Sequence, residues 1–150
     1  MNVKTSKVSV PKDVTALCEQ VARGYERRRR DYERRRLDVI YSRGSGVVEF
    51  GGRSGFSNPN AYKSERLERL EGCLDVKLIH AVDEALLMLG ADVVRESRER
   101  LRRAMLLNCE NGREFPYEVL GLDEFSRSDF YRRKKGFIKG IGVALGLVEV

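Results

Sequence analysis

The chain has 150 residues, of which 41% are hydrophobic and 35% are charged, and its formal net charge is +6. This length predicts one domain, or one core with an attached element. The composition argues against a disordered chain, and apolar runs of only a few residues argue against a membrane-spanning helix. The first ten residues are too polar for a signal peptide, so we expect a cytoplasmic protein.

Arginine supplies 21 of the 29 basic side chains. Its planar guanidinium matches phosphate groups and guanine edges, which indicates a nucleic acid as the first partner to consider. Solvated helix faces, in which these arginines pair with the 23 acidic residues, are the alternative explanation of the same composition.

Residues that could carry catalysis or bind a metal are few. Cys18, Cys73 and Cys109 are widely spaced, so we expect free thiols rather than disulfides or a zinc site. His80 is the only histidine, and its helical setting favours a packing or surface role. No phosphate-binding loop, zinc-protease motif or catalytic triad pattern is present. The sequence therefore predicts a protein that is not an enzyme and uses no cofactor.

The first predicted element is one long helix from about Ser9 to Tyr41. Ser9 is a candidate N-cap, and Pro11 suits the first turn, where an N–H is not needed. Gly24 is the only helix breaker within it. One face follows heptad spacing through Val14, Cys18, Val21, Tyr25, Arg28, Tyr32, Arg35 and Val39. This pattern predicts a packing seam in the first and last thirds of the helix.

The middle of this helix is rich in arginine. Eight arginines against three acidic residues give a local excess of +5, and they are Arg23, Arg27 to Arg30 and Arg34 to Arg36. Arg28 and Arg35 fall on the seam, where a buried charge needs a partner. We therefore expect this part to project from the core or to meet an acidic partner. Arg27, Arg28 and Arg30 are candidate DNA contacts.

Residues 44–58 hold five of the 14 glycines and predict a mobile linker, although residues 47–50 alternate as a short hairpin strand would. A second helix is expected over residues 58–89, with apolar side chains along one face. Gly72 is placed to kink this helix and Gly90 to end it. A third helix is expected over residues 92–110, with charged residues on its outer faces.

The C-terminal part has the pattern of a helix-turn-helix over about residues 113–147. A short helix is expected over residues 116–120, followed by a turn at Gly121. Ser126 then begins an S-x-x-D helix start, and the last helix runs to about Leu145. The span of residues 115–122 is short for the first helix of such a motif.

Basic side chains gather in the N-terminal part of the last helix, where the helix dipole would favour acidic residues. Residues 127–139 carry six positive charges and one negative charge. A helix that delivers these turns to base edges and phosphates would have this composition. Phe130 and Phe137 are expected to face the protein core. The candidate DNA contacts are Arg127, Ser128, Tyr131, Arg132, Arg133, Lys135 and Lys139.

Residues 126–147, SRSDFYRRKKGFIKGIGVALGL, resemble the C-terminal recognition segment of the RinA/ArpU-type transcriptional regulators of phages and prophages, which is itself similar to the fourth region of sigma factors. Two earlier segments agree in order with that family, namely residues 10–14, VPKDV, and residues 58–64, NPNAYKS. The second of these resembles the D-P-T-x-x-K-A motif at the start of the family's central helix. The resemblance implies a phage-type regulator that binds double-stranded DNA, and it leaves a contact with RNA polymerase and a homodimer open.

These observations together predict an all-α protein. We expect an arginine-rich N-terminal helix over residues 1–43, a glycine-rich linker over residues 44–58, and a helical domain over residues 59–150 that ends in the helix-turn-helix. A DNA-binding transcriptional regulator is the favoured function. An oligomeric DNA-recognition or assembly protein of a phage packaging complex is the alternative, and it would differ by forming a ring.

Overall fold

The structure, a computed structural model, describes residues 9–42 and 59–149 of the chain. Within these residues the chain forms α-helices and one short 3-10 helix and no strand, so the expected all-α class is confirmed. None of these helices is long and apolar enough to cross a membrane. The linker predicted over residues 44–58, with its hairpin strand, lies outside the described residues.

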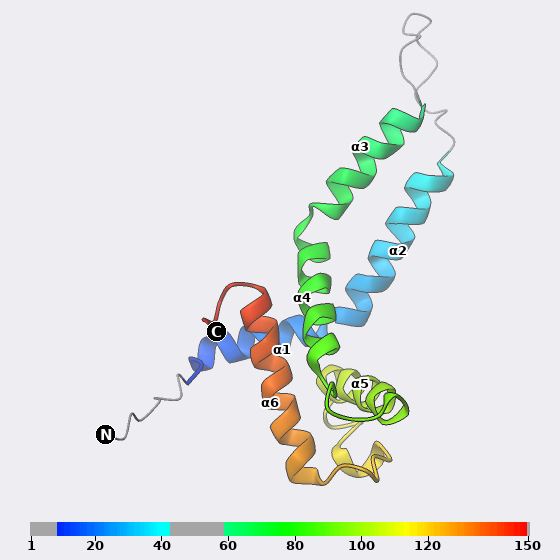
Figure 1. Cartoon of the computed structure of the whole chain (residues 1–150). Helices are drawn as coiled ribbons and strands as arrows, with labels where there is room; N and C mark the ends of the chain where they lie inside the picture. Colours follow the sequence, from blue (N-terminus) through cyan, green and yellow to red (C-terminus); the bar gives the residue numbers. More distant parts are fainter. Residues whose placement is uncertain (1–8, 43–58, 150) are drawn as a thin grey trace, which may run out of the picture. The chain divides into compact units, whose positions relative to one another are not determined.

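Figure 1 labels the helices in chain order, and the chain divides into two compact units. The first unit is Met1–Gly24 with Ala81–Val150, and the second is Tyr25–His80. This division differs from the boundaries expected from the sequence. The elements are α1 (Lys12–Arg23), α2 (Tyr25–Tyr41), α3 (Pro59–Glu71), α4 (Leu74–Met88), α5 (Arg95–Glu110), the 3-10 helix η2 (Tyr117–Val119) and α6 (Arg127–Ala144).

The single helix expected from Ser9 to Tyr41 is wrong, because the structure divides this segment at Gly24. Gly24 adopts φ −85° and ψ 1°, and its N–H still donates to the Gln20 carbonyl at 3.1 Å. Glycine weakens a helix interior, since it has no side chain to pack and loses the most backbone freedom on folding. The heptad seam is therefore shared between two helices that belong to different units.

The other predicted breaks agree with the structure. The second expected helix is interrupted after Glu71, so Gly72 and Cys73 separate α3 from α4. Gly90 follows the C-terminal end of α4, and its φ of +76° is a left-handed conformation that favours glycine. The third expected helix begins at Arg95 rather than at residue 92, because Val94 is still extended.

In the first unit, α1 packs against α5 and α6. The buried side of α1 presents Cys18, Val21 and Ala22. A Cβ atom built on Gly142 of α6 would lie 2.7 Å from Val148 Cγ2 and 3.2 Å from the Cys18 sulfur. A larger residue at this position would therefore force Val148 or Cys18 to move, because α6 packs closely against α1 and the C-terminal segment.

In the second unit, α2 and α3 lie side by side and antiparallel (Figure 1). Tyr25 and Val39 of α2 are buried. The ammonium group of Lys63 donates a hydrogen bond to the Ile40 carbonyl at 3.1 Å, near the C-terminal end of α2. This unit thus combines a small apolar contact with polar contacts at the helix end.

The segment between α5 and α6 is closed by one tyrosine. The Tyr117 hydroxyl donates to the Phe125 carbonyl, and the Tyr117 ring lies 5.8 Å from the ring of Phe130 in α6. The helix expected over residues 116–120 is only the 3-10 turn η2. The first helix of a full-length helix-turn-helix is therefore absent from residues 113–126, where the sequence also left it little room.

Ser126 caps α6 as its sequence motif predicts. The Ser126 hydroxyl accepts a hydrogen bond from the Asp129 backbone N–H at 3.0 Å, and Ser126 itself is extended. This bond satisfies one of the N–H groups that have no partner at a helix start. The cap fixes the residue at which the basic helix begins.

Replacing the capping hydroxyl should destabilise the protein. We expect Ser126→Ala to lower the free energy of unfolding by about 0.5–2 kcal/mol, because the first turn loses a hydrogen-bond acceptor. Urea unfolding followed by circular dichroism measures this. Ser128→Ala is the matched control, since Ser128 is exposed within the helix and alanine favours helix. Equal stability of the two variants would contradict the capping role.

Candidate nucleic-acid interface

The rotation of α6 is set by a buried apolar face. Phe130 and Ile141 have no exposed surface, and Phe137 is buried beside them. These positions recur at spacings of seven and four, so they lie on one side of the helix. The expected inward direction of Phe130 and Phe137 is confirmed. The opposite side of α6 must therefore face solvent.

That opposite side carries a continuous line of polar residues, which we call the α6 polar row: Ser128, Arg132, Lys135 and Lys139. Their spacing of four, three and four keeps them on one face, and all of them are exposed. Each of them is among the sequence-predicted contacts. The structure thus brings four of the seven predicted α6 residues together on one surface.

Arg127 and Tyr131 flank this row one turn apart. The Arg127 guanidinium carbon lies 5.7 Å from the centre of the Tyr131 ring, and Arg127 Nη1 lies 2.8 Å from Glu118 Oε1. Tyr131 also meets Phe130 edge to face, with ring centres 5.3 Å apart. Both predicted residues are exposed and are held in defined orientations by these contacts.

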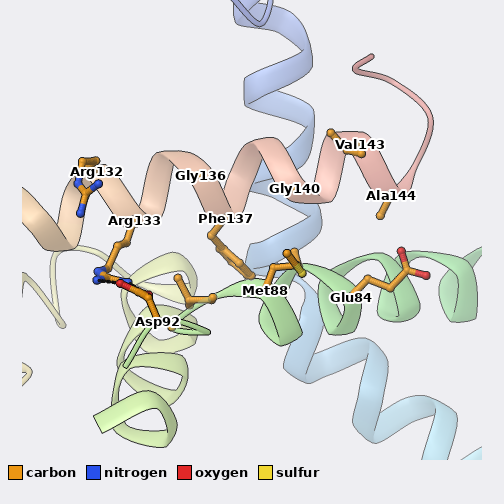
Figure 2. A pocket seen from close by; sticks show the side chains of 13 residues that line it. Glu84, Met88, Asp92, Arg132, Arg133, Gly136, Phe137, Gly140, Val143 and Ala144 are labelled. Carbon is orange, nitrogen blue, oxygen red and sulfur yellow. Dashed lines mark hydrogen bonds and ion pairs between the residues drawn. The ribbon is translucent and has the colours of Figure 1, made fainter. Parts of the chain in front are cut away.

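Arg133 has a different environment from the one expected for a phosphate contact. Its guanidinium donates two hydrogen bonds of 2.8 Å to the Asp92 carboxylate and one of 3.1 Å to Asp129, and the Asp92 pair is visible in Figure 2. Its side chain is only 14% exposed and lies over the Phe125 ring at 5.1 Å. Arg133 therefore fastens α6 to the segment before α5, and we leave it out of the interface.

Charge in this cluster changes the acidity of the carboxyl groups. Hydrogen bonds from Arg133 lower the pKa of Asp92 from 3.8 to about 2. Hydrogen bonds from Arg132, and then from Arg133, lower the pKa of Asp129. Donation by guanidinium groups favours the ionised carboxylate, and it is bidentate from Arg133 to Asp92. At Asp129 it consists of one hydrogen bond each from Arg132 and Arg133.

A further basic residue of α6 was not predicted to have a structural role. The ammonium group of Lys134 donates to Asn108 Oδ1 at 2.7 Å, and Asn108 Nδ2 donates to the Phe115 carbonyl at 2.8 Å. Asn108 is buried in α5. Lys134 sits on the inner side of α6, and its helical phase relative to Phe130 and Phe137 was the only sequence signal for this role.

The arginines of α2 also separate into inner and outer residues. Arg28 is 14% exposed, and its Nε lies 4.0 Å from the Asp75 carboxylate. Burial, followed by repulsion from Arg27, lowers the pKa of Arg28 against the attraction of Asp75. The expectation that a seam arginine meets an acidic partner is confirmed for Arg28. As a DNA contact Arg28 is poorly placed.

The outer face of α2 carries a second line, which we call the α2 arginine row: Arg27, Arg30 and Arg34. All three are exposed, and Arg34 was not among the predicted contacts. Within the part of the chain that the structure describes, no carboxylate lies within ion-pair distance of Arg27 or Arg30. Arg30 lies three residues after Arg27, and Arg34 lies four residues after Arg30. This helical spacing is the sequence signal that would have added Arg34 to the predicted contacts.

Loss of the Asp92 carboxylate should loosen α6. We expect Asp92→Asn to lower the urea midpoint of unfolding and to make that midpoint less dependent on pH in acid. The ionised Asp92 carboxylate stabilises the fold fully above pH about 4, and this stabilisation is lost as the pH falls through about 2. Unfolding midpoints between pH 7 and pH 2 measure this. Asp123→Asn is the matched control, since Asp123 is exposed and has no ion pair within the described ranges. The same acid slope in parent and Asp92→Asn would contradict the role of this pair.

Comparison with known proteins adds no family to this geometry. No family model matches the chain. Searches of curated proteins and of solved structures also return no match.

Proposed function

We propose that this chain is a DNA-binding transcriptional regulator of the phage type and that α6 reads duplex DNA in the major groove. The observation that supports this most strongly is the α6 polar row, which faces solvent along the first turns while the other side of the helix is buried. A major groove about 12 Å wide admits one α-helix. Arg127 and Tyr131, beside the row at the helix start, are the residues we assign to base edges.

The placement of these cations is poor for helix stability, which favours a binding role. Positive side chains near a helix N-terminus oppose the helix dipole. The ion pairs of Arg127 with Glu118 and of Arg132 with Asp129 are solvent-exposed. Such pairs contribute about 0–1 kcal/mol, so a DNA phosphate can replace the carboxylate at little cost.

The proposal requires α6 to enter the groove without a long preceding helix. In helix-turn-helix proteins the first helix crosses the DNA backbone. The three residues of η2 are too few for that task. Contacts with the phosphate backbone therefore fall to Lys135 and Lys139 of α6, which lie one turn apart.

The α2 arginine row is a second candidate contact, and we assign it to phosphates. Arginines at spacing three and four lie along one edge of a helix, with a rise of 1.5 Å per residue, so they can follow a phosphate backbone. We assign no contact with base edges to these three arginines. We therefore expect this row to increase affinity for every sequence alike.

The deciding experiment selects DNA fragments with the purified protein and sequences them. Binding of the selected duplex and of an unrelated duplex is then measured by fluorescence anisotropy at several salt concentrations. A regulator should prefer the selected duplex by at least about a thousandfold. The absence of any enriched sequence, together with affinity that does not depend on salt, would refute the proposal.

Base contacts should show in specificity. We expect Arg127→Ala and Tyr131→Ala to weaken binding of the selected duplex by about 1–3 kcal/mol and to leave the unrelated duplex nearly unchanged. Tyr131→Phe, which keeps the ring packed on Phe130, separates loss of the hydroxyl from loss of the ring. Circular dichroism must show that each variant is folded. Unchanged binding of the selected duplex by folded Arg127→Ala and Tyr131→Ala would exclude the assignment of α6 as the recognition helix.

Phosphate contacts should show in salt dependence. We expect Lys139→Ala, and separately Arg27→Ala with Arg30→Ala, to weaken both duplexes equally and to reduce the slope of log K against log salt by about 0.9 per lost contact. Lys12→Ala is the matched control, since Lys12 is exposed on α1 and removes the same charge. If Lys12→Ala changes the slope as much as Lys139→Ala does, net charge rather than the α6 surface governs binding.

A further inference from the structure

A groove runs between α4 and α6 on the side of α6 next to the polar row. It has a volume of about 550 Å³, and all its lining residues belong to the first unit. Figure 2 shows α6 along one wall and α4 along the other. The middle of the groove is apolar, and its walls include Ala85, Met88, Phe137 and Val143.

The α6 wall of the groove contains two glycines one turn apart, Gly136 and Gly140. A Cβ atom on Gly140 would lie 3.4 Å from Ala85 Cβ, which is ordinary contact. A Cβ atom on Gly136 would have no neighbour within 4 Å. Glycine costs about 1 kcal/mol relative to alanine in a helix interior, and nothing within the fold requires it at position 136. A second surface that approaches the α6 backbone closely would account for it.

A large apolar side chain stands at the edge of the same groove. Met88 lines the groove and is 76% exposed, and its neighbour Leu87 is also exposed. Methionine is flexible and fills irregular apolar spaces well. The surface therefore carries both a protruding apolar side chain and, at Gly136, a place without side chains that could receive one.

Charges of opposite sign border this surface. Glu84 lies one turn before Met88 on α4, and Arg132 lies one turn before Gly136 on α6, at opposite ends of the groove (Figure 2). Within the described ranges Glu84 has no cation at ion-pair distance. Arg132 bonds Asp129, and the other donors of its guanidinium fork are available. The groove thus has an acidic end and a basic end.

We propose that a second copy of this chain docks in this groove around a two-fold axis. In a two-fold contact the same surface patch of the two copies meets, so the patch must be self-complementary. Here Met88 of one copy enters the groove over Gly136 of the other, and Glu84 of each copy meets Arg132 of the other. This choice of occupant rests on the charge complementarity and does not depend on DNA binding.

Sedimentation velocity of the full chain over micromolar to hundreds of micromolar concentrations tests the proposal. We expect the parent to reach twice the chain mass of 17.2 kDa. The leucine side chain of Gly136→Leu would occupy the open space in the groove that Met88 of the other copy enters. It should therefore raise the dimer dissociation constant at least about tenfold, or about 1.4 kcal/mol. Ala16→Leu is the matched control, since it adds a leucine at an exposed position of α1, outside the groove lining and without a change of charge. It should leave the dissociation constant within about twofold.

Charge reversal tests the two-fold contact itself. Glu84→Arg alone and Arg132→Glu alone place like charges together, so each should sediment as a monomer. An equimolar mixture of the two variants should dimerise, because each contact then joins an arginine to a glutamate. Recovery in the mixture cannot arise from effects within one copy.

Three results would overturn the proposal. They are a parent that stays monomeric at all concentrations, a Gly136→Leu variant that is folded by circular dichroism and dimerises like the parent, and a mixture that fails to recover. None of these measurements contains DNA, so their failure is distinguishable from failure of the proposed function.

Discussion

The burial of Phe130, Phe137 and Ile141 fixes the rotation of α6, and the two proposed binding surfaces follow from that rotation. Because an α-helix has 3.6 residues per turn, one buried face determines the direction of every other side chain. The polar row is thereby directed to solvent, and Gly136 is directed to the groove beside α4. A different rotation would bury cations and expose aromatic rings, at a large cost in free energy.

Polar contacts then decide which cations remain available. Arg133 is engaged by Asp92 and Asp129, and Lys134 is engaged by buried Asn108. These two side chains hold α6 to the region around α5, because the Asp92 carboxylate and the Asn108 amide accept their hydrogen bonds. The net charge of this helix consequently overstates the charge that it presents to a partner, and the interface depends on the residues outside these contacts.

The two surfaces on α6 share a border at Arg132. This residue belongs to the α6 polar row and also lines the groove. A dimer formed at the groove would therefore fix the spacing between two copies of the polar row. Spacing of this kind relates protein symmetry to the symmetry of a DNA site in dimeric helix-turn-helix proteins. Dimerisation and DNA recognition would be coupled by geometry without any change of conformation.

The sequence by itself determined the all-α class, the helix boundaries near Gly72 and Gly90, the Ser126 cap, and the inward face of α6. These features depend on local periodicity and on end residues, which one segment contains completely. Only the tertiary structure decided that Gly24 separates two helices, that η2 is a single turn, and that Arg133 and Lys134 have structural roles. Asp92 and Asn108, which engage these two cations, lie 41 and 26 residues before them in the chain. Such contacts form when distant segments pack, so no local pattern of charge could distinguish a structural arginine from an exposed one.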